Sequence, residues 1–177
     1  MRLKVGAKTP DFAGATASGE RVTLDSLRGR NVVLKFYRFA SCPVCNLSVR
    51  DYVRRSDDLS RAGLTTVMFY HSPARLIEKK LRTKTPFAVV ADPAKDVFRE
   101  YAVESSWRGM SSLRMWRQYM RAMFAGFMTR PFGHQGGMIG YPADFLIDKD
   151  GVVRYAHYGA DYSDSLTADD CLRIAGE

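Results

Sequence analysis

The feature that most constrains the fold is an alternation of short apolar segments with amphipathic ones. The run Asn-Val-Val-Leu-Lys-Phe-Tyr-Arg-Phe at 31–39 is β-branched and aromatic, which is typical of a strand. Pro43 then stands where a helix would begin, and apolar residues recur at mostly helical spacing up to Gly63. The same reading predicts strands at 64–70 and 87–91, and helices at 73–82 and from Pro93. Such alternation builds βαβ units, so we expect an α/β fold with a largely parallel sheet.

The end of the chain adds an antiparallel element. Two apolar runs, 143–148 and 152–158, flank Lys149-Asp150-Gly151, and an Asp-Gly pair between such runs predicts a hairpin. The sheet is therefore expected to be mixed, with a short helix at 167–175 closing the chain. A chain of 177 residues with 46% hydrophobic residues supports one domain over 1–177, since its core needs neither disulfides nor a structural metal.

The net charge of +8 is unevenly distributed. Residues 61–130 hold 13 basic and 5 acidic residues, whereas residues 131–177 hold 3 and 8. A basic middle attracts anions, yet no helix-turn-helix, RNP pattern, zinc finger or Lys/Arg tract is present, so no nucleic-acid partner is expected. Without a membrane-length apolar run or a signal-peptide pattern, and with three cysteines, we expect a cytoplasmic protein.

A segment at about 105–140 breaks the alternation and is expected to be a helical insertion. It holds six of the eight methionines, both tryptophans, five arginines and no acid. A helix over 111–129 would carry an apolar stripe beside a basic one, formed by Leu113, Trp116, Met120, Met123 and Phe127 and by Arg114, Arg117 and Arg121. Such spacing favours packing as a cover over the active-site face. Recognition of an apolar substrate or partner is an alternative, and attachment to an anionic membrane is disfavoured.

The motif that carries chemistry is Cys42-Pro43-Val44-Cys45, between the first long strand and its helix. Unpaired backbone N–H groups and the helix dipole at a helix start stabilise a thiolate, which is the reactive form of cysteine. The spacing lets the second sulfur resolve a mixed disulfide formed by the first. Two inert buried thiols are the alternative. A zinc site is not expected, because His71, His134, His157 and Cys171 lack a second paired spacing.

Two stretches carry a family resemblance. Gly6-Ala7-Lys8-Thr9-Pro10-Asp11-Phe12 with Leu27 through Tyr37, and Phe145-Leu146-Ile147-Asp148 through Arg154, resemble the alkyl hydroperoxide reductase and thiol-specific antioxidant (peroxiredoxin-like) family. The match spans nearly the whole chain except 105–140. It implies a thioredoxin-like three-layer sandwich with a mixed central sheet and an N-terminal extension. It also implies an antioxidant, thiol-dependent oxidoreductase that needs no cofactor.

The sequence departs from that family at the site itself. The peroxidatic motif Pro-x-x-x-Thr/Ser-x-x-Cys, counted back from Cys45, places Arg38 at the proline and Cys42 at the threonine. The arginine that the family places before its Phe-Leu-Ile-Asp-like strand is replaced by Pro142. A proline there resembles the cis-proline loop of thioredoxins, which would leave the backbone of Tyr141 free to pair with a substrate. A plain strand-start proline is the alternative.

We therefore predict a dithiol–disulfide cycle that reduces protein or small-molecule disulfides. Cys42, expected to be the more exposed, attacks as a thiolate that Arg38 tunes, and Cys45 resolves; Tyr141 is expected to line the thiol pocket. In the alternative, Cys45 is the peroxidatic cysteine and Cys42 captures its sulfenic acid. A non-catalytic interaction module using the basic insertion is a further alternative. The expected partners are a thiol or disulfide substrate and a thioredoxin or glutathione system, with a homodimer common among similar proteins.

Overall fold

The computed structural model describes residues 1–177 except 82, 104–111, 128–139 and 177. In that part of the chain the central sheet has five strands in the order β5-β4-β3-β6-β7. Their bounds are β3 Asn31–Tyr37, β4 Leu64–Tyr70, β5 Ala88–Ala91, β6 Ala143–Ile147 and β7 Val153–Tyr158. β3, β4 and β5 are parallel, whereas β6 runs antiparallel to β3 and to β7. The sheet is mixed, as the hairpin in the sequence predicted.

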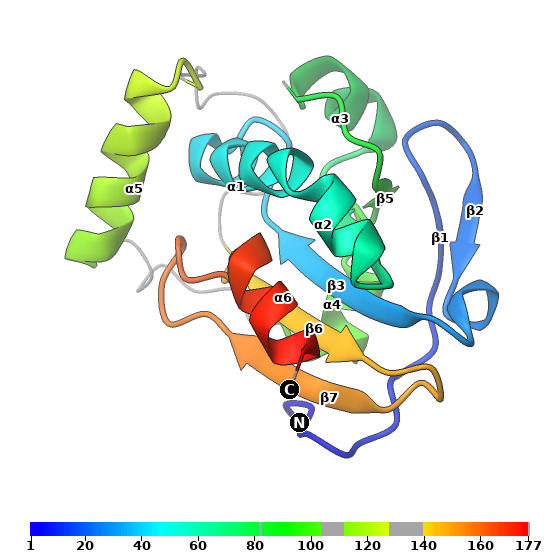
Figure 1. Ribbon diagram of the computed structural model, residues 1–177. Helices are drawn as coiled ribbons and strands as arrows, with labels where there is room; N and C mark the ends of the chain where they lie inside the picture. Colours follow the sequence, from blue (N-terminus) through cyan, green and yellow to red (C-terminus); the bar gives the residue numbers. More distant parts are fainter. Residues whose placement is uncertain (82, 104–111, 128–139, 177) are drawn as a thin grey trace.

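Helices cover one face of the sheet. They are α1 Pro43–Arg54, α2 Ser56–Arg61, α3 Ala74–Lys80 and α6 Ala168–Ala175. The core on this face joins Val33 and Tyr37 of β3 to Val49 and Tyr52 of α1, and Cys171 of α6 belongs to it. Figure 1 shows α1, α2 and α6 lying across this face.

The other face is covered by α4 Asp96–Glu100 and the N-terminal segment. That segment contains β1 Ala13–Ala15, β2 Arg21–Thr23 and the 3₁₀ turn Asp25–Leu27. Val32, Leu34 and Phe36 of β3 point to this side, so β3 alternates between two cores and reads as a nearly continuous apolar run. The result is the predicted three-layer α/β sandwich with an N-terminal extension.

The helix of the insertion is α5, Leu113–Phe124, which packs on the outer side of α1 (Figure 1). Ser112 caps its start, since the side chain accepts a hydrogen bond from the Met115 N–H. The rest of the predicted insertion, including the outer ends of the 111–129 helix, lies outside the described residues. None of the described helices has the length and apolarity that crossing a bilayer would require.

Two predicted details of the elements are wrong. The helix expected from Pro43 to Gly63 is two helices, with Arg55 between α1 and α2. The stripe expected to face the core is split: Leu113, Trp116 and Met120 point to solvent, whereas Phe127, after the end of α5, is buried with Leu47 of α1. Within α5 the buried residues are Met115 and Ala122. The apolar spacing was expected to mark the side of the helix that faces the protein. That side is instead marked by Met115 and Ala122.

Candidate active site

The two cysteines lie at the start of α1, directly after the carboxyl end of β3. Cys42 is the N-cap, with extended backbone, and its Sγ accepts the N–H of Cys45 at 3.2 Å. Pro43 occupies the first helical turn, where its missing N–H costs nothing. The chain thus gives Cys42 the position at which a serine or aspartate side chain ordinarily accepts a backbone N–H. This contact stabilises negative charge on the sulfur.

Arg38 supplies a second donor to the same sulfur. Its Nη2 lies 3.2 Å from the Cys42 Sγ, and the residue is only 8% exposed. The guanidinium is stacked over the ring of Tyr162, with the carbon of the guanidinium 4.3 Å from the ring centre. Arg38, which stands where the family has proline, therefore provides the positive charge of this site. Pro142, at the place of the family's arginine, could not provide one.

The surroundings of the two thiols shift their pKa values in opposite directions. Burial raises the pKa of Cys42, but hydrogen bonding from the Cys45 side chain and the charge of Arg38 outweigh it and lower that pKa from 9.0 to about 6. Burial raises the pKa of Cys45 well above its ordinary value, and donation to Cys42 raises it further. Burial is the largest single influence on the pKa of Arg38 and lowers it, but the charges of Cys42 and Cys45 and the hydrogen bonds to them together raise this pKa above its ordinary value. At neutral pH Cys42 is the thiolate and Cys45 the protonated thiol that donates to it.

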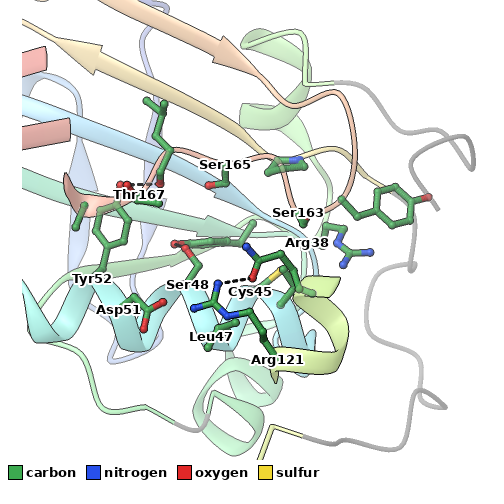
Figure 2. Close-up of a pocket in the computed structure, with 17 residues that line it drawn as sticks. Arg38, Cys45, Leu47, Ser48, Asp51, Tyr52, Arg121, Ser163, Ser165 and Thr167 are labelled. Atoms are coloured by element: carbon green, nitrogen blue, oxygen red, sulfur yellow. Dashed lines mark hydrogen bonds between the residues drawn. The ribbon is translucent and has the colours of Figure 1, made fainter. Parts of the chain in front are cut away.

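Cys45 faces a cavity of about 100 Å³ between β3, α1, α5 and the loop before α6 (Figure 2). The residues around it include Arg38, Cys45, Ser48, Arg121, Pro142 and Tyr162. Cys45 is 5% exposed and Cys42 0% exposed, so the prediction that Cys42 is the more exposed sulfur is wrong. Arg38 and the first turn of α1 enclose Cys42, and the same contacts that make it acidic remove it from solvent.

Pro142 lines the same cavity as Cys45. Its peptide bond with Tyr141 is trans, as are the other bonds of the described residues, so the expected likeness to a cis-proline loop is not found. The Pro142 carbonyl is occupied by the N–H of Gly159 at 2.9 Å. Tyr141 does not line the cavity; its ring packs against that of Tyr162, with 5.8 Å between ring centres.

A buried ion pair supports the wall of the cavity, and the sequence analysis missed it. The Lys35 Nζ lies 2.6 Å from Oδ1 of Asp144, and both residues are fully buried. Lys35 also donates to the Ser165 hydroxyl at 3.0 Å and to the Leu166 carbonyl at 2.8 Å, and the Leu166 N–H donates to Asp144 at 2.7 Å. Through these hydrogen bonds the pair holds the loop before α6 against β3 and β6 of the sheet. A lysine inside an otherwise apolar strand was the available signal.

The remaining candidates have other surroundings. Cys171 is fully buried, and its sulfur lies 3.1 Å from the Tyr52 hydroxyl. His71 is buried against Phe98, His157 lies 3.3 Å from Asp164, and His134 is outside the described residues. In the described ranges no three His, Cys, Asp or Glu side chains are grouped as a metal site would need.

A cysteine pair at the start of a helix behind the central strand of a mixed sheet, with one sulfur held as an anion, defines a thiol-dependent oxidoreductase of the thioredoxin fold. The family can be stated as well. The model of the AhpC/TSA family matches residues 5–156, and the chain belongs to that family. The resemblance read from the sequence is confirmed, and the non-catalytic alternative is not carried further.

Individual relatives agree with this assignment. A putative peroxiredoxin of Mycobacterium tuberculosis is 25% identical over 158 residues, covering 89% of this chain and 86% of the relative. Among solved structures, peroxidoxin BcpB of M. tuberculosis superposes with a TM-score of 0.71 at 18% identity, covering 99% and 97% of the two chains. A putative thiol:disulfide interchange protein DsbE of Chlorobium tepidum gives 0.64 at 21% identity, covering 98% and 99%. These structures share the thioredoxin-like fold.

Proposed function

We propose that the protein reduces disulfides by cycling Cys42 and Cys45 between dithiol and disulfide, with Cys42 attacking first. The observation that carries this order is the convergence of two donors, the Arg38 guanidinium and the Cys45 N–H, on the Cys42 sulfur at 3.2 Å each. A thiolate is the attacking species, and Cys42 is the sulfur with the lowered pKa.

The chemistry needs two exchange steps. The Cys42 thiolate attacks a substrate disulfide R–S–S–R, the Cys42–S–S–R bond forms, and RS⁻ leaves. Cys45 then gives up its proton, for which the departing thiolate is the acceptor, and attacks the Cys42 sulfur. The Cys42–Cys45 disulfide forms as the second RS⁻ leaves. An external thiol pair returns the two electrons, and a thioredoxin or glutathione system in the cytoplasm is the donor that we propose.

Access of a substrate to the attacking sulfur requires that side chains around it move. Both sulfurs are buried, and the Arg38–Tyr162 stack lies beside Cys42. Cys42 does not line the cavity, so a substrate disulfide reaches its sulfur only after the Arg38–Tyr162 stack moves aside.

Hydroperoxide reduction with Cys45 as the peroxidatic cysteine is the second candidate. The observation in its favour is that Cys45, and not Cys42, lines the cavity, at the position that matches the peroxidatic cysteine of the family. The Cys45 thiolate would attack ROOH and form a sulfenic acid as RO⁻ leaves, and RO⁻ would take a proton from solvent to become ROH. Cys42 would then displace water and form the same disulfide.

Variants in which one of the two active-site cysteines is replaced show whether Cys42 or Cys45 attacks first. We expect Cys45→Ser to hold a stable mixed disulfide at Cys42 after reaction with dithiobis(nitrobenzoate), identified by peptide mass spectrometry, and Cys42→Ser to react at least about tenfold more slowly at pH 7. Cys171→Ala serves as the matched control and should behave like the wild type. If Cys42→Ser instead forms a sulfenic acid with hydrogen peroxide as fast as the wild type loses its thiols, the peroxidatic order is correct.

A further inference from the structure

The outer face of α5 is an apolar surface without a partner in the chain as described. Leu113 is 78% exposed, Trp116 52%, Met120 43% and Phe124 86%. These four side chains recur at spacings of three and four residues and form one stripe, which we call the α5 stripe. The other large apolar residues that are exposed in the described chain, Met1, Val5 and Tyr155, lie elsewhere. A cluster of this kind marks an interaction surface.

The helix has three distinct sides. At 100° per residue, Met115 and Ala122 mark the side that packs on the protein, and the α5 stripe lies roughly opposite. Arg114, Arg117 and Arg121 fall between the two, along one border of the stripe. Arg121 lies on the side of the catalytic cavity and lines it, and Figure 2 shows its side chain reaching toward the α1 residues.

The charges beside the α5 stripe indicate what kind of partner binds there. α5 contains three arginines and no acid, and the sequence has no acid anywhere in 105–140. Arg114 is paired with Asp164, and Arg121 donates to the neutral Gln118, so Arg117 and Arg121 retain uncompensated charge beside the stripe. Two copies that met antiparallel through this stripe would bring these arginines to the same side, where they repel. An apolar stripe with an aromatic residue and bordering arginines matches an anionic lipid surface.

We propose that α5 docks the protein on the surface of an anionic lipid bilayer. Leu113, Trp116, Met120 and Phe124 enter the boundary between headgroups and acyl chains, and Arg117 contacts lipid phosphates. The inference goes beyond the redox function, because binding needs no turnover.

The test uses the full chain and vesicles of phosphatidylglycerol with phosphatidylcholine. In a Trp107→Phe background Trp116 is the sole tryptophan, and we expect its emission to shift to shorter wavelength with these vesicles at low salt. Flotation should recover the protein with the anionic vesicles, and much less of it with phosphatidylcholine alone or in 0.5 M salt. Leu113→Ser with Phe124→Ser should weaken partitioning at least about tenfold, and Arg117→Gln should weaken it for anionic vesicles only.

Matched controls come from β7, where Tyr155→Ser and Arg154→Gln change an exposed aromatic residue and an exposed arginine outside α5. They should bind vesicles like the wild type. The side chains substituted on α5 and β7 are exposed, so circular dichroism should show unchanged folding relative to the Trp107→Phe background. Absence of flotation with anionic vesicles, or equal binding by the Leu113→Ser Phe124→Ser protein, overturns the proposal. A dimer that the same double substitution dissociates, without vesicle binding, assigns the surface to a second copy instead.

Discussion

Replacing Arg38 by methionine tests the electrostatic origin of the Cys42 thiolate. Methionine keeps an apolar stem in contact with Tyr162 and removes the charge that lies 3.2 Å from the sulfur. Loss of an adjacent cation raises an acid's pKa by about one to three pH units, so we expect the pKa of Cys42 to rise from about 6 to about 8. At pH 7 the thiolate fraction then falls from about nine-tenths to about one-tenth.

The reaction rate at pH 7 is a poor readout of that change. A thiolate of higher pKa is intrinsically more nucleophilic, by about eightfold for two pH units, and this nearly offsets the smaller thiolate fraction. The pH profile of Cys42 alkylation by iodoacetamide, followed by peptide mass spectrometry in a Cys171→Ala background that keeps the Cys45 donor, resolves the two effects. We expect Arg38→Met to react about tenfold more slowly at pH 5 and about sevenfold faster at pH 9.

The control is Arg50→Met. Arg50 stacks on Phe127 and makes no hydrogen bond or ion pair with either sulfur in the described structure, so its removal should leave the midpoint near 6. Thiolate absorbance near 240 nm gives an independent titration of the same group. Profiles of the wild type and Arg38→Met that share one midpoint would refute the assignment of the lowered pKa to Arg38.

Further predictions concern the structure around the cavity. Lys35→Met should cost about 3–5 kcal/mol in urea unfolding by leaving a buried carboxylate unpaired, and adding Asp144→Leu should restore most of that loss. Gly159→Ala should cost about 1–3 kcal/mol, because its methyl group would lie 2.4 Å from a carbonyl oxygen of the facing loop. Gly176→Ala, with its nearest contact at 3.6 Å, should change thermal stability little. Cys171→Ala should leave the yield of the Cys42–Cys45 disulfide unchanged by mass spectrometry, at a cost of about 1 kcal/mol.

The fold was predictable because its signals are local. The strand at 31–39, the proline at the first helical turn and the Asp-Gly turn at 150–151 each report a backbone preference that the packed structure keeps. The antiparallel insertion of β6 beside β3 depends on long-range pairing, and only the family resemblance indicated it.

The sequence was enough to identify the two cysteines of the candidate site, but not the residues that surround them. The place of Cys42 at the start of a helix was enough to predict a lowered pKa. Its burial could not be predicted in this way, because it depends on the side chains packed around it. One of them is Tyr162, which stacks on Arg38 and comes from a loop far along the chain. The same holds for Lys35, whose carboxylate partner is 109 positions away. On α5 the apolar spacing was recognised, but spacing alone does not say which side of a helix meets the protein.

The contact between Arg38 and Cys42 also bears on the direction in which electrons prefer to flow. Forming the disulfide removes the anion that the buried guanidinium faces, and no acid pairs with that guanidinium in the described structure. The oxidised protein therefore carries an interior cation without its counterion, which penalises oxidation relative to an ordinary dithiol. We therefore expect the Cys42–Cys45 disulfide to have a comparatively high reduction potential, so that the dithiol reduces only substrate disulfides of still higher potential and is readily regenerated by thiol donors of moderate reducing strength.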